Sequence, residues 1–267
     1  NGILQGETEE VSGDISSGEP MWIGESTDET NTAHSGDIKD VRLYNYALPM
    51  DSVAKLFDSY DIDPPEMVAH WPMDEGSGTV VADAVGGNDG TIVGDNPPEW
   101  IAEGGLAFNN IDSNHVEVAH ADILDFADES FTVSMLVRYE TDDGTTDRWL
   151  IKGTHGGDGT GSRYELFKTS GGTVRFSIDN GPDNIKSKLE VPGGPYLTGK
   201  WCHVVAVRDA VYDTTMLFAN SIFQGGTRDN SGDISSGEPM WIGESTDETN
   251  TAMSGDMKDV RIYNYAM

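Results

Sequence analysis

Two acidic loops carry residue types that bind a divalent cation. The segment NNIDSNH at 109–115 offers Asp112 and Asn114 directly before an apolar strand, and GESTDETN at 243–250 offers Glu244 and Asp247 directly after another. Ca²⁺ takes about six to eight oxygen ligands from carboxylates, amides and carbonyls that loops bring together. If the fold brings these loops together, they form a calcium site. If it does not, the residues are ordinary acids of solvated loops.

Motifs for catalysis are missing from the sequence. A glycosidase on a β-sandwich needs two carboxylates about 5 Å apart, and the acidic stretches at 125–130 and 140–147 lack the alternation that would place two acids on one strand face. The six histidines are scattered singly, and no Ser-His-Asp order, P-loop or zinc-protease spacing occurs. The sequence predicts a protein that is not an enzyme. A glycosidase whose acids lie far apart in the sequence stays open as an alternative.

The composition excludes some partners. A net charge of −31 with only 16 Lys and Arg argues against nucleic acid, because phosphate binding needs clustered cations. Bound divalent cations or a saline medium would relieve the repulsion among so many carboxylates, although a solvated acidic surface explains them equally well. The single cysteine, Cys202, permits no intrachain disulfide, and no apolar stretch approaches the roughly 18–20 residues that cross a bilayer.

Short strands dominate the hydrophobic pattern. Apolar residues alternate with polar ones at 131–138 and at 174–178, and 32 glycines interrupt the chain. This period of two predicts an all-β fold of many short antiparallel strands, arranged as a sandwich. One helical turn is expected at 49–57, where Pro49 and Asp51 suit the first turn. The acidic stretch 58–66, which contains Pro64 and Pro65, is expected to be a linker.

The chain contains one passage twice. Residues 12–33 recur letter for letter at 231–252, and only ten positions differ when 1–48 is aligned with 220–267. Such self-similarity is typical of tandem domains. We therefore expect residues 1–57 to be the last strands and the closing helical turn of a preceding repeat, 58–66 to be a linker, and 67–267 to be a complete domain.

Several segments together resemble one family. In chain order they are VAHWPMDEGSGTVVADAVGGNDGTIVG at 68–94, LAFNNIDSNHVEVAH at 106–120, FTVSMLVRYE at 131–140, KWCHVVAVRD at 200–209 and SGDMKDVRIYNYAM at 254–267. Their order resembles the laminin-G-like domains of the concanavalin A-like lectin and glucanase superfamily, which are related to the pentraxins and occur in tandem in bacterial surface proteins. The resemblance implies a two-sheet jelly roll of roughly a dozen strands and an extracellular location.

The resemblance also bears on the acidic loops. In the related pentraxins, an Asp-Asn pair before the equivalent strand and acids in the equivalent late loop hold calcium. On this likeness Asn114 matches the amide ligand and Asp247 the late-loop acid, whereas Asp112 and Glu244 match only after a shift of register.

Other side chains are candidates for different contacts. Trp100 follows NPPE in a loop and could stack on a sugar, while Arg163 and Tyr164 lie near glycine-rich loops and could meet hydroxyl groups. All three could instead serve packing. A structural ion near Asp74 and Asp259, where the first and last strands should meet, is a further possibility. The tryptophans inside expected strands are predicted to pack in the core: Trp71, Trp149, Trp201 and Trp241.

These observations favour a non-catalytic, extracellular binding or adhesion module that recognises a polysaccharide or cell-surface glycan with the help of calcium. Weak sites that are repeated along one chain bind a surface with greater avidity, so a tandem array of domains would strengthen binding. The alternative is a structural subunit of an extracellular filament or surface layer. In that case its partners are copies of itself, and segment 1–48 of one chain takes the place of 220–267 in another by strand exchange.

Overall fold

The computed structural model describes residues 66–267 except 112, 140–142, 156–160, 182–184, 247–248 and 250, together with Met21, Ile23 and Val41. The chain divides into two units, residues 1–64 and 65–267. The expected helical turn at 49–57 and nearly all of the expected linker at 58–66 lie outside the described residues. So do two of the expected calcium ligands, Asp112 and Asp247.

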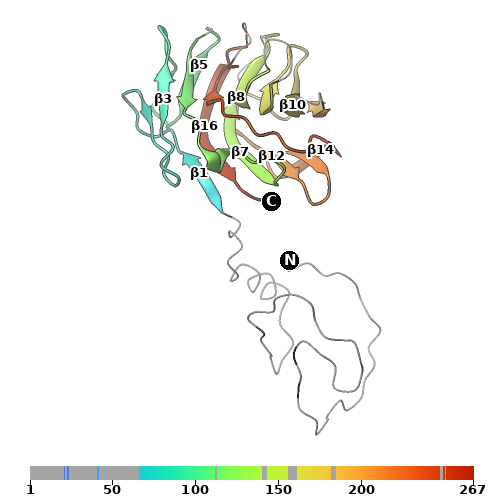
Figure 1. Ribbon diagram of the computed structural model, residues 1–267. Helices are drawn as coiled ribbons and strands as arrows, with labels where there is room; N and C mark the ends of the chain where they lie inside the picture. Colours follow the sequence, from blue (N-terminus) through green and yellow to red (C-terminus); the bar gives the residue numbers. More distant parts are fainter. Residues whose placement is uncertain are drawn as a thin grey trace. The chain divides into compact units, whose positions relative to one another are not determined.

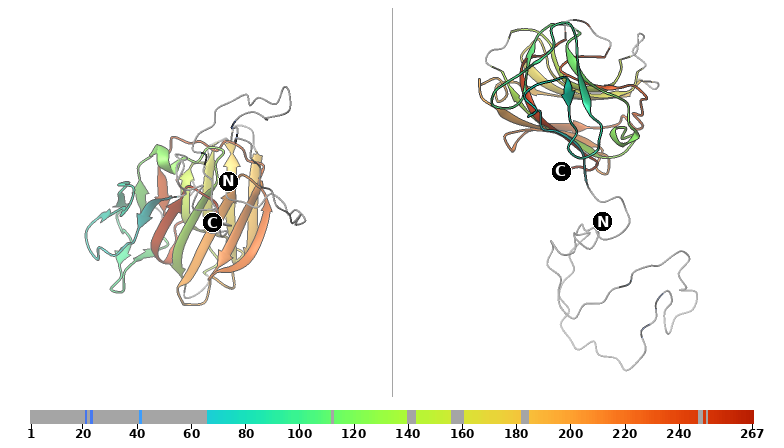
Figure 2. Two further views of the ribbon diagram at one scale, coloured as in Figure 1. Left: turned by 90° about the horizontal axis from the view of Figure 1, so that it is seen from below. Right: turned by 90° about the vertical axis from the view of Figure 1, so that its left-hand side faces the viewer.

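The second unit consists of two antiparallel sheets (Figures 1 and 2). The first sheet has the order β14 (Ile222–Arg228), β13 (Thr214–Ala219), β12 (Cys202–Asp209), β7 (Phe131–Arg138), β16 (Ser254–Tyr263), β5 (Leu106–Asn109) and β4 (Glu99–Trp100), and β1 (Met67–Trp71) also pairs with β16. The second sheet has the order β11 (Ile185–Pro192), β10 (Thr173–Asn180), β9 (Arg163–Lys168), β8 (Asp147–Gly153), β15 (Met240–Ile242), β6 (His115–Val118), β3 (Gly90–Val93) and β2 (Val80–Val81). One short 3₁₀ helix, η1 (Asp122–Leu124), precedes β7. The predicted all-β jelly-roll sandwich is confirmed.

The core lies between the sheets and follows the alternation of the strands. On β7, Phe131, Val133, Met135 and Val137 are buried in the core cluster, as a period of two requires. The ring of Phe131 contacts that of Tyr164 from the opposite sheet, with centroids 4.7 Å apart. Aromatic contacts of this kind hold the two layers together.

Two of the four tryptophans predicted for the core do lie there. Trp71 and Trp149 are fully buried. The prediction was wrong for the other two, which are only partly buried. Trp201 lies beneath the cations of Arg138 and Lys258, which are 4.7 and 4.4 Å from its ring centroid. Trp241 stacks on a histidine instead of packing in the core. Its neighbours on β15 point inward, and therefore Trp241 points outward.

Identical residues have opposite burial in the two units. Met240 and Ile242 of β15 are completely buried. Their counterparts in the first copy of the repeat, Met21 and Ile23, are 63% and 57% exposed. The sequence of the closing strands therefore does not by itself bury these side chains. The surrounding sandwich is needed as well, including β6 and β8, which flank β15 in the same sheet.

Candidate functional site

The loop before β6 and the loop after β15 meet, because these two strands are neighbours in the second sheet. The backbone N–H of Ser113 donates to Oε1 of Glu244 at 2.7 Å, and Nδ1 of His115 lies 3.1 Å from Oε2 of the same carboxylate. Gly243 permits this approach, since its φ of +95° favours glycine and a side chain there would collide with the ring of Phe108. The structure thus brings the Asn114 loop and Glu244 together.

Asn114 and Glu244 both take part in internal hydrogen bonds. The Oδ1 atom of Asn114 accepts from the backbone N–H of Asn96 at 3.2 Å, and its Nδ2 atom donates to the carbonyl of Ile111 at 2.9 Å. Asn114 is 3% exposed and Glu244 is 4% exposed. Their oxygens are of the hard type that suits Ca²⁺. Within the described residues, however, no group of three or more His, Cys, Asp or Glu side chains is placed to hold a metal ion. A calcium shell here would depend on Asp112 and Asp247.

A hollow of about 470 Å³ lies beside these loops. Its lining residues come from the β1–β2 loop, the β3–β4 loop, β4, the end of β5 and the loop before β6: Gly78, Asp95, Asn96, Pro97, Pro98, Glu99, Trp100, Asn109 and Ile111. The indole N–H of Trp100 donates to the carbonyl of Gly78 at 2.9 Å, and Nδ2 of Asn109 donates to the carbonyl of Asn96, also at 2.9 Å. These bonds fix the ring and the wall of the hollow. The bond between Asn96 and Asn114 joins the hollow to the predicted calcium loop.

Tyr164 belongs to the core. It is 2% exposed, and its hydroxyl donates to the carbonyl of Leu124 at 3.1 Å. Burial raises the pKa of this phenol far above its usual range. Its neighbour Arg163 points to the outer face of the second sheet, where Nη2 forms a 2.8 Å ion pair with Asp179. Both side chains therefore have internal partners, and neither of them lines the hollow.

Glu165 is the most heavily engaged carboxylate on that outer face. Burial raises the pKa of Glu165, but a hydrogen bond from His155 and the charges of Arg148 and Arg163 outweigh burial and lower the pKa to about 2. The shortest of these ion pairs joins Glu165 to Nη1 of Arg148 at 3.2 Å. A carboxyl that stays ionised at neutral pH cannot donate the proton that glycoside cleavage requires.

Asp147 has the opposite shift. Burial raises the pKa of its carboxyl to about 6, although Lys168 lies 3.2 Å away. An acid with such a pKa can serve as a proton donor. Yet the side chains of Asp147 and Lys168 are both completely buried, so a polysaccharide would not reach them in this conformation.

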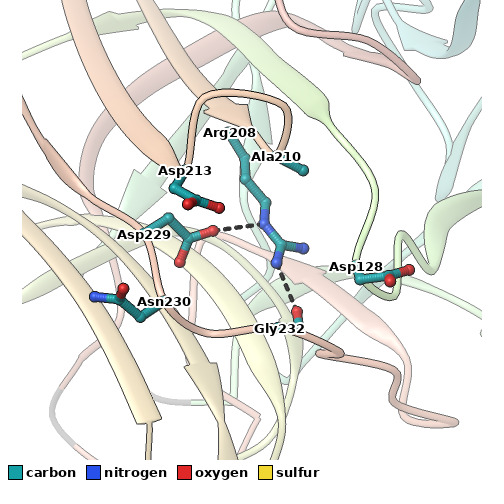
Figure 3. Close-up of a pocket in the computed structure, with 7 residues that line it drawn as sticks. All are labelled: Asp128, Arg208, Ala210, Asp213, Asp229, Asn230 and Gly232. Atoms are coloured by element: carbon teal, nitrogen blue, oxygen red, sulfur yellow. Dashed lines mark hydrogen bonds and ion pairs between the residues drawn. The ribbon is translucent and has the colours of Figure 1, made fainter.

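A second hollow, of about 380 Å³, surrounds Arg208 (Figure 3). The guanidinium is 2% exposed. Its Nε donates to Asp229 at 2.8 Å, and its two terminal nitrogens donate to the carbonyls of Ala127 and Gly232 and to the hydroxyl of Ser231. The arginine thus connects the loop before β7 with the segment after β14. Because its hydrogen bonds go to protein atoms, it is a structural element rather than a ligand contact.

The carboxylate of Asp259 has protein side chains as partners. Its Oδ1 atom lies 2.7 Å from Nε2 of His70 on β1 and 2.9 Å from the guanidinium of Arg261. Asp74, the other acid considered for a structural ion, is exposed. The contact of Asp259 with His70 joins β1 to β16 in addition to the pairing of the two strands.

Two features of the site were not predicted from the sequence. Trp241 and His115 stack with ring centroids 3.6 Å apart. The same histidine lies 3.1 Å from the carboxylate of Glu244. The alternation of side chains along each strand places both rings on the outer face of the sheet, so their proximity could have been predicted from the sequence. The acids beside Trp100 were also missed, because the pairing of β4 with β5 that opens the hollow has no local signature.

The two-sheet jelly roll, with its loops at the ends of the strands, places this chain among the β-sandwich proteins. The family model of the concanavalin A-like lectin/glucanases superfamily matches residues 110–267, and the chain belongs to this family.

Solved structures agree with this assignment. The binding domain of Paraclostridial Mosquitocidal Protein 1 superimposes with a TM-score of 0.59 at 10% identity, covering 75% of this chain and 49% of that chain. The botulinum neurotoxin serotype D binding domain gives 0.56 at 13% identity, with 75% and 48% covered. The serotype D ligand-binding domain in complex with N-acetylneuraminic acid gives 0.57 at 12%, again with 75% and 48% covered.

The chain spans about half the length of these structures, and at such identities the likeness shows the fold alone. Among curated proteins, none matches the sequence significantly. The described residues include no helix that is long and apolar enough to cross a membrane.

Proposed function

We propose that this chain is a non-catalytic extracellular module that binds a glycan at the Trp100 hollow. The observation that carries the proposal is the hollow itself, in which a partly exposed indole ring is held in place among polar residues. Sugars present apolar faces edged by hydroxyl groups, and a rigid aromatic ring with polar neighbours complements them.

The family and the neighbours support this proposal. The family is one of lectins and glucanases, and the neighbours are binding domains of toxins, one of them in complex with a sugar. Lack of catalysis is proposed because the two carboxyls with the largest described pKa shifts are unsuited to it. Glu165 stays ionised, and Asp147 is enclosed.

Calcium is part of the proposal. Asp112, Asn114, Glu244 and Asp247 would supply hard oxygen ligands from the two loops that meet beside β6 and β15. When bound, the ion would contribute positive charge and order these loops. Since Asn114 bonds to Asn96 and Asn96 lines the hollow, ordering the loops would also fix one wall of the glycan site.

A glycan array probed with the full chain in the presence of Ca²⁺ tests the proposal. The wild type and Tyr212→Ala should bind the same glycans, and Trp100→Ala should lose them. Tyr212 is the matched control because it is a 63% exposed aromatic residue that lies outside the hollow. If Trp100→Ala binds as the wild type does, the site assignment fails.

The opposite burial of identical residues favours a second candidate, the structural subunit. Residues 1–48 repeat the sequence of the closing strands, and apolar side chains such as Met21 are exposed there. The strands within residues 66–219 need one such segment, and residues 220–267 already supply it. We therefore rank glycan binding first. Light scattering tests this ranking, because concentration-dependent oligomers would favour the structural subunit.

A further inference from the structure

The hydrogen-bond donors of the Trp100 hollow are largely committed to the protein. The indole N–H of Trp100 bonds to Gly78, and the side-chain amide of Asn109 bonds to Asn96. What the hollow offers a ligand is mainly acceptors. The carboxylates of Asp95 and Glu99 are both exposed at its wall. Among the described residues that line it, none is Lys or Arg.

This arrangement discriminates among sugars by charge. A carboxylate on the ligand would face Asp95 and Glu99 with no cation to compensate, and the net charge of −31 adds a repulsive field around the whole chain. A ligand ammonium group would instead form charge-assisted hydrogen bonds with the same two carboxylates. A neutral sugar would stack on Trp100 and donate only uncharged hydroxyl groups to these carboxylates, which gives weaker hydrogen bonds.

We propose that the hollow selects a glycan that carries protonated amino groups, such as an oligomer of glucosamine, and rejects sugars that carry a carboxylate. This inference rests on the proposed function, since it names the class of glycan that the Trp100 site takes. It separates this chain from its structural neighbour in complex with N-acetylneuraminic acid, which is an acidic sugar. Trp100 provides the stacking surface, while Asp95 and Glu99 accept the ammonium hydrogens.

Calorimetry with the full chain at pH 5.5, where the sugar amines are protonated, tests the inference with three probes. These are a glucosamine hexamer, its fully N-acetylated counterpart and sialyllactose. The glucosamine hexamer should bind about tenfold more tightly than the acetylated one, and the difference should shrink in 0.5 M salt. Sialyllactose should not bind.

Two pairs of substitutions separate local recognition from general attraction to an acidic protein. Asp95→Asn with Glu99→Gln should abolish the preference for the amine, so that the glucosamine hexamer and the acetylated hexamer bind with equal affinity. Asp122→Asn with Glu238→Gln changes the net charge equally at exposed acids outside the hollow, and should keep the preference. If this control pair also abolishes the preference, the inference is overturned.

The outcomes also distinguish this inference from the proposed function. If the acetylated hexamer binds through Trp100 with the same affinity as the glucosamine hexamer, the charge selectivity is wrong and the glycan site stands. If no glycan binds in a way that Trp100→Ala removes, the proposed function fails, and the inference fails with it.

Discussion

Replacing Arg208 with methionine tests how the sandwich is held together (Figure 3). Methionine keeps much of the length and packing of the side chain and removes the charge. Asp229, which is 4% exposed, would then be a buried carboxylate without its 2.8 Å partner. Breaking a buried ion pair from one side costs about 3–5 kcal/mol. The carbonyls of Ala127 and Gly232 would lose donors as well, so the upper part of this range is expected.

The second half of the experiment removes the unpaired charge of Asp229. In Arg208→Met with Asp229→Asn, the amide oxygen can still accept from the N–H and hydroxyl of Ser231, as the carboxylate does now. The double variant should therefore recover about half of the lost stability, since the penalty for an unpaired buried charge is gone.

Urea unfolding followed by tryptophan fluorescence measures both variants. At about 2–4 °C per kcal/mol for a domain of this size, a loss of about 4–5 kcal/mol should also lower the melting temperature of the single variant by about 8–20 °C. Glu190→Gln is a suitable control, because Glu190 forms a more exposed ion pair with Arg175, for which a loss of at most about 1 kcal/mol is expected. A loss below 1 kcal/mol in Arg208→Met would refute the assignment of Arg208 as a structural tie.

Three further outcomes are expected. The pKa of Glu165 is lowered from 4.5 to about 2. Its ionised form therefore contributes about 3 kcal/mol to the free energy of unfolding above pH 4.5, and this contribution is lost as the pH falls toward 2. Glu165→Gln should flatten this part of the curve of stability against pH. Met240→Ala should cost about 2–5 kcal/mol and Met21→Ala less than 0.5, because the first side chain is buried and the second is exposed; equal losses would show that both copies are packed. Millimolar Ca²⁺ should raise the melting temperature, and Asp112→Ala with Asp247→Ala should remove the rise, whereas a rise that persists would rule out these ligands.

Much of the fold could be predicted from local patterns. The alternation at 131–138 correctly predicted the strand that became β7, since period two is a property of the strand itself. The same rule, applied strictly, would have placed Trp241 outside. It was assigned to the core because its neighbours Met240 and Ile242 are apolar, but on a strand such neighbours indicate the opposite face.

The candidate site was predictable only in part. The resemblance to the family implied that the loops at 109–115 and 243–250 would approach each other. The hydrogen bond from the N–H of Ser113 to Glu244 could not be predicted in this way. It depends on the backbone conformation of the loop, which has a φ of 69° at Ser113. Likewise, Trp100 was recognised as a candidate, whereas Asn109 was not. The two meet only because β4 pairs with β5.

Ion pairs occupy part of each outer face of the sandwich. On the first sheet, Asp259 is paired with Arg261. On the second sheet, Asp179 is 2.8 Å from Arg163, and both are buried. A ligand over this second pair would have to displace it, and removing one partner of a buried pair is costly. The Trp100 hollow imposes no such cost, because its exposed carboxylates pair with no cation among the described residues. A ligand can therefore gain contacts there without first breaking any, which is why we propose recognition at the loops rather than on the sheets.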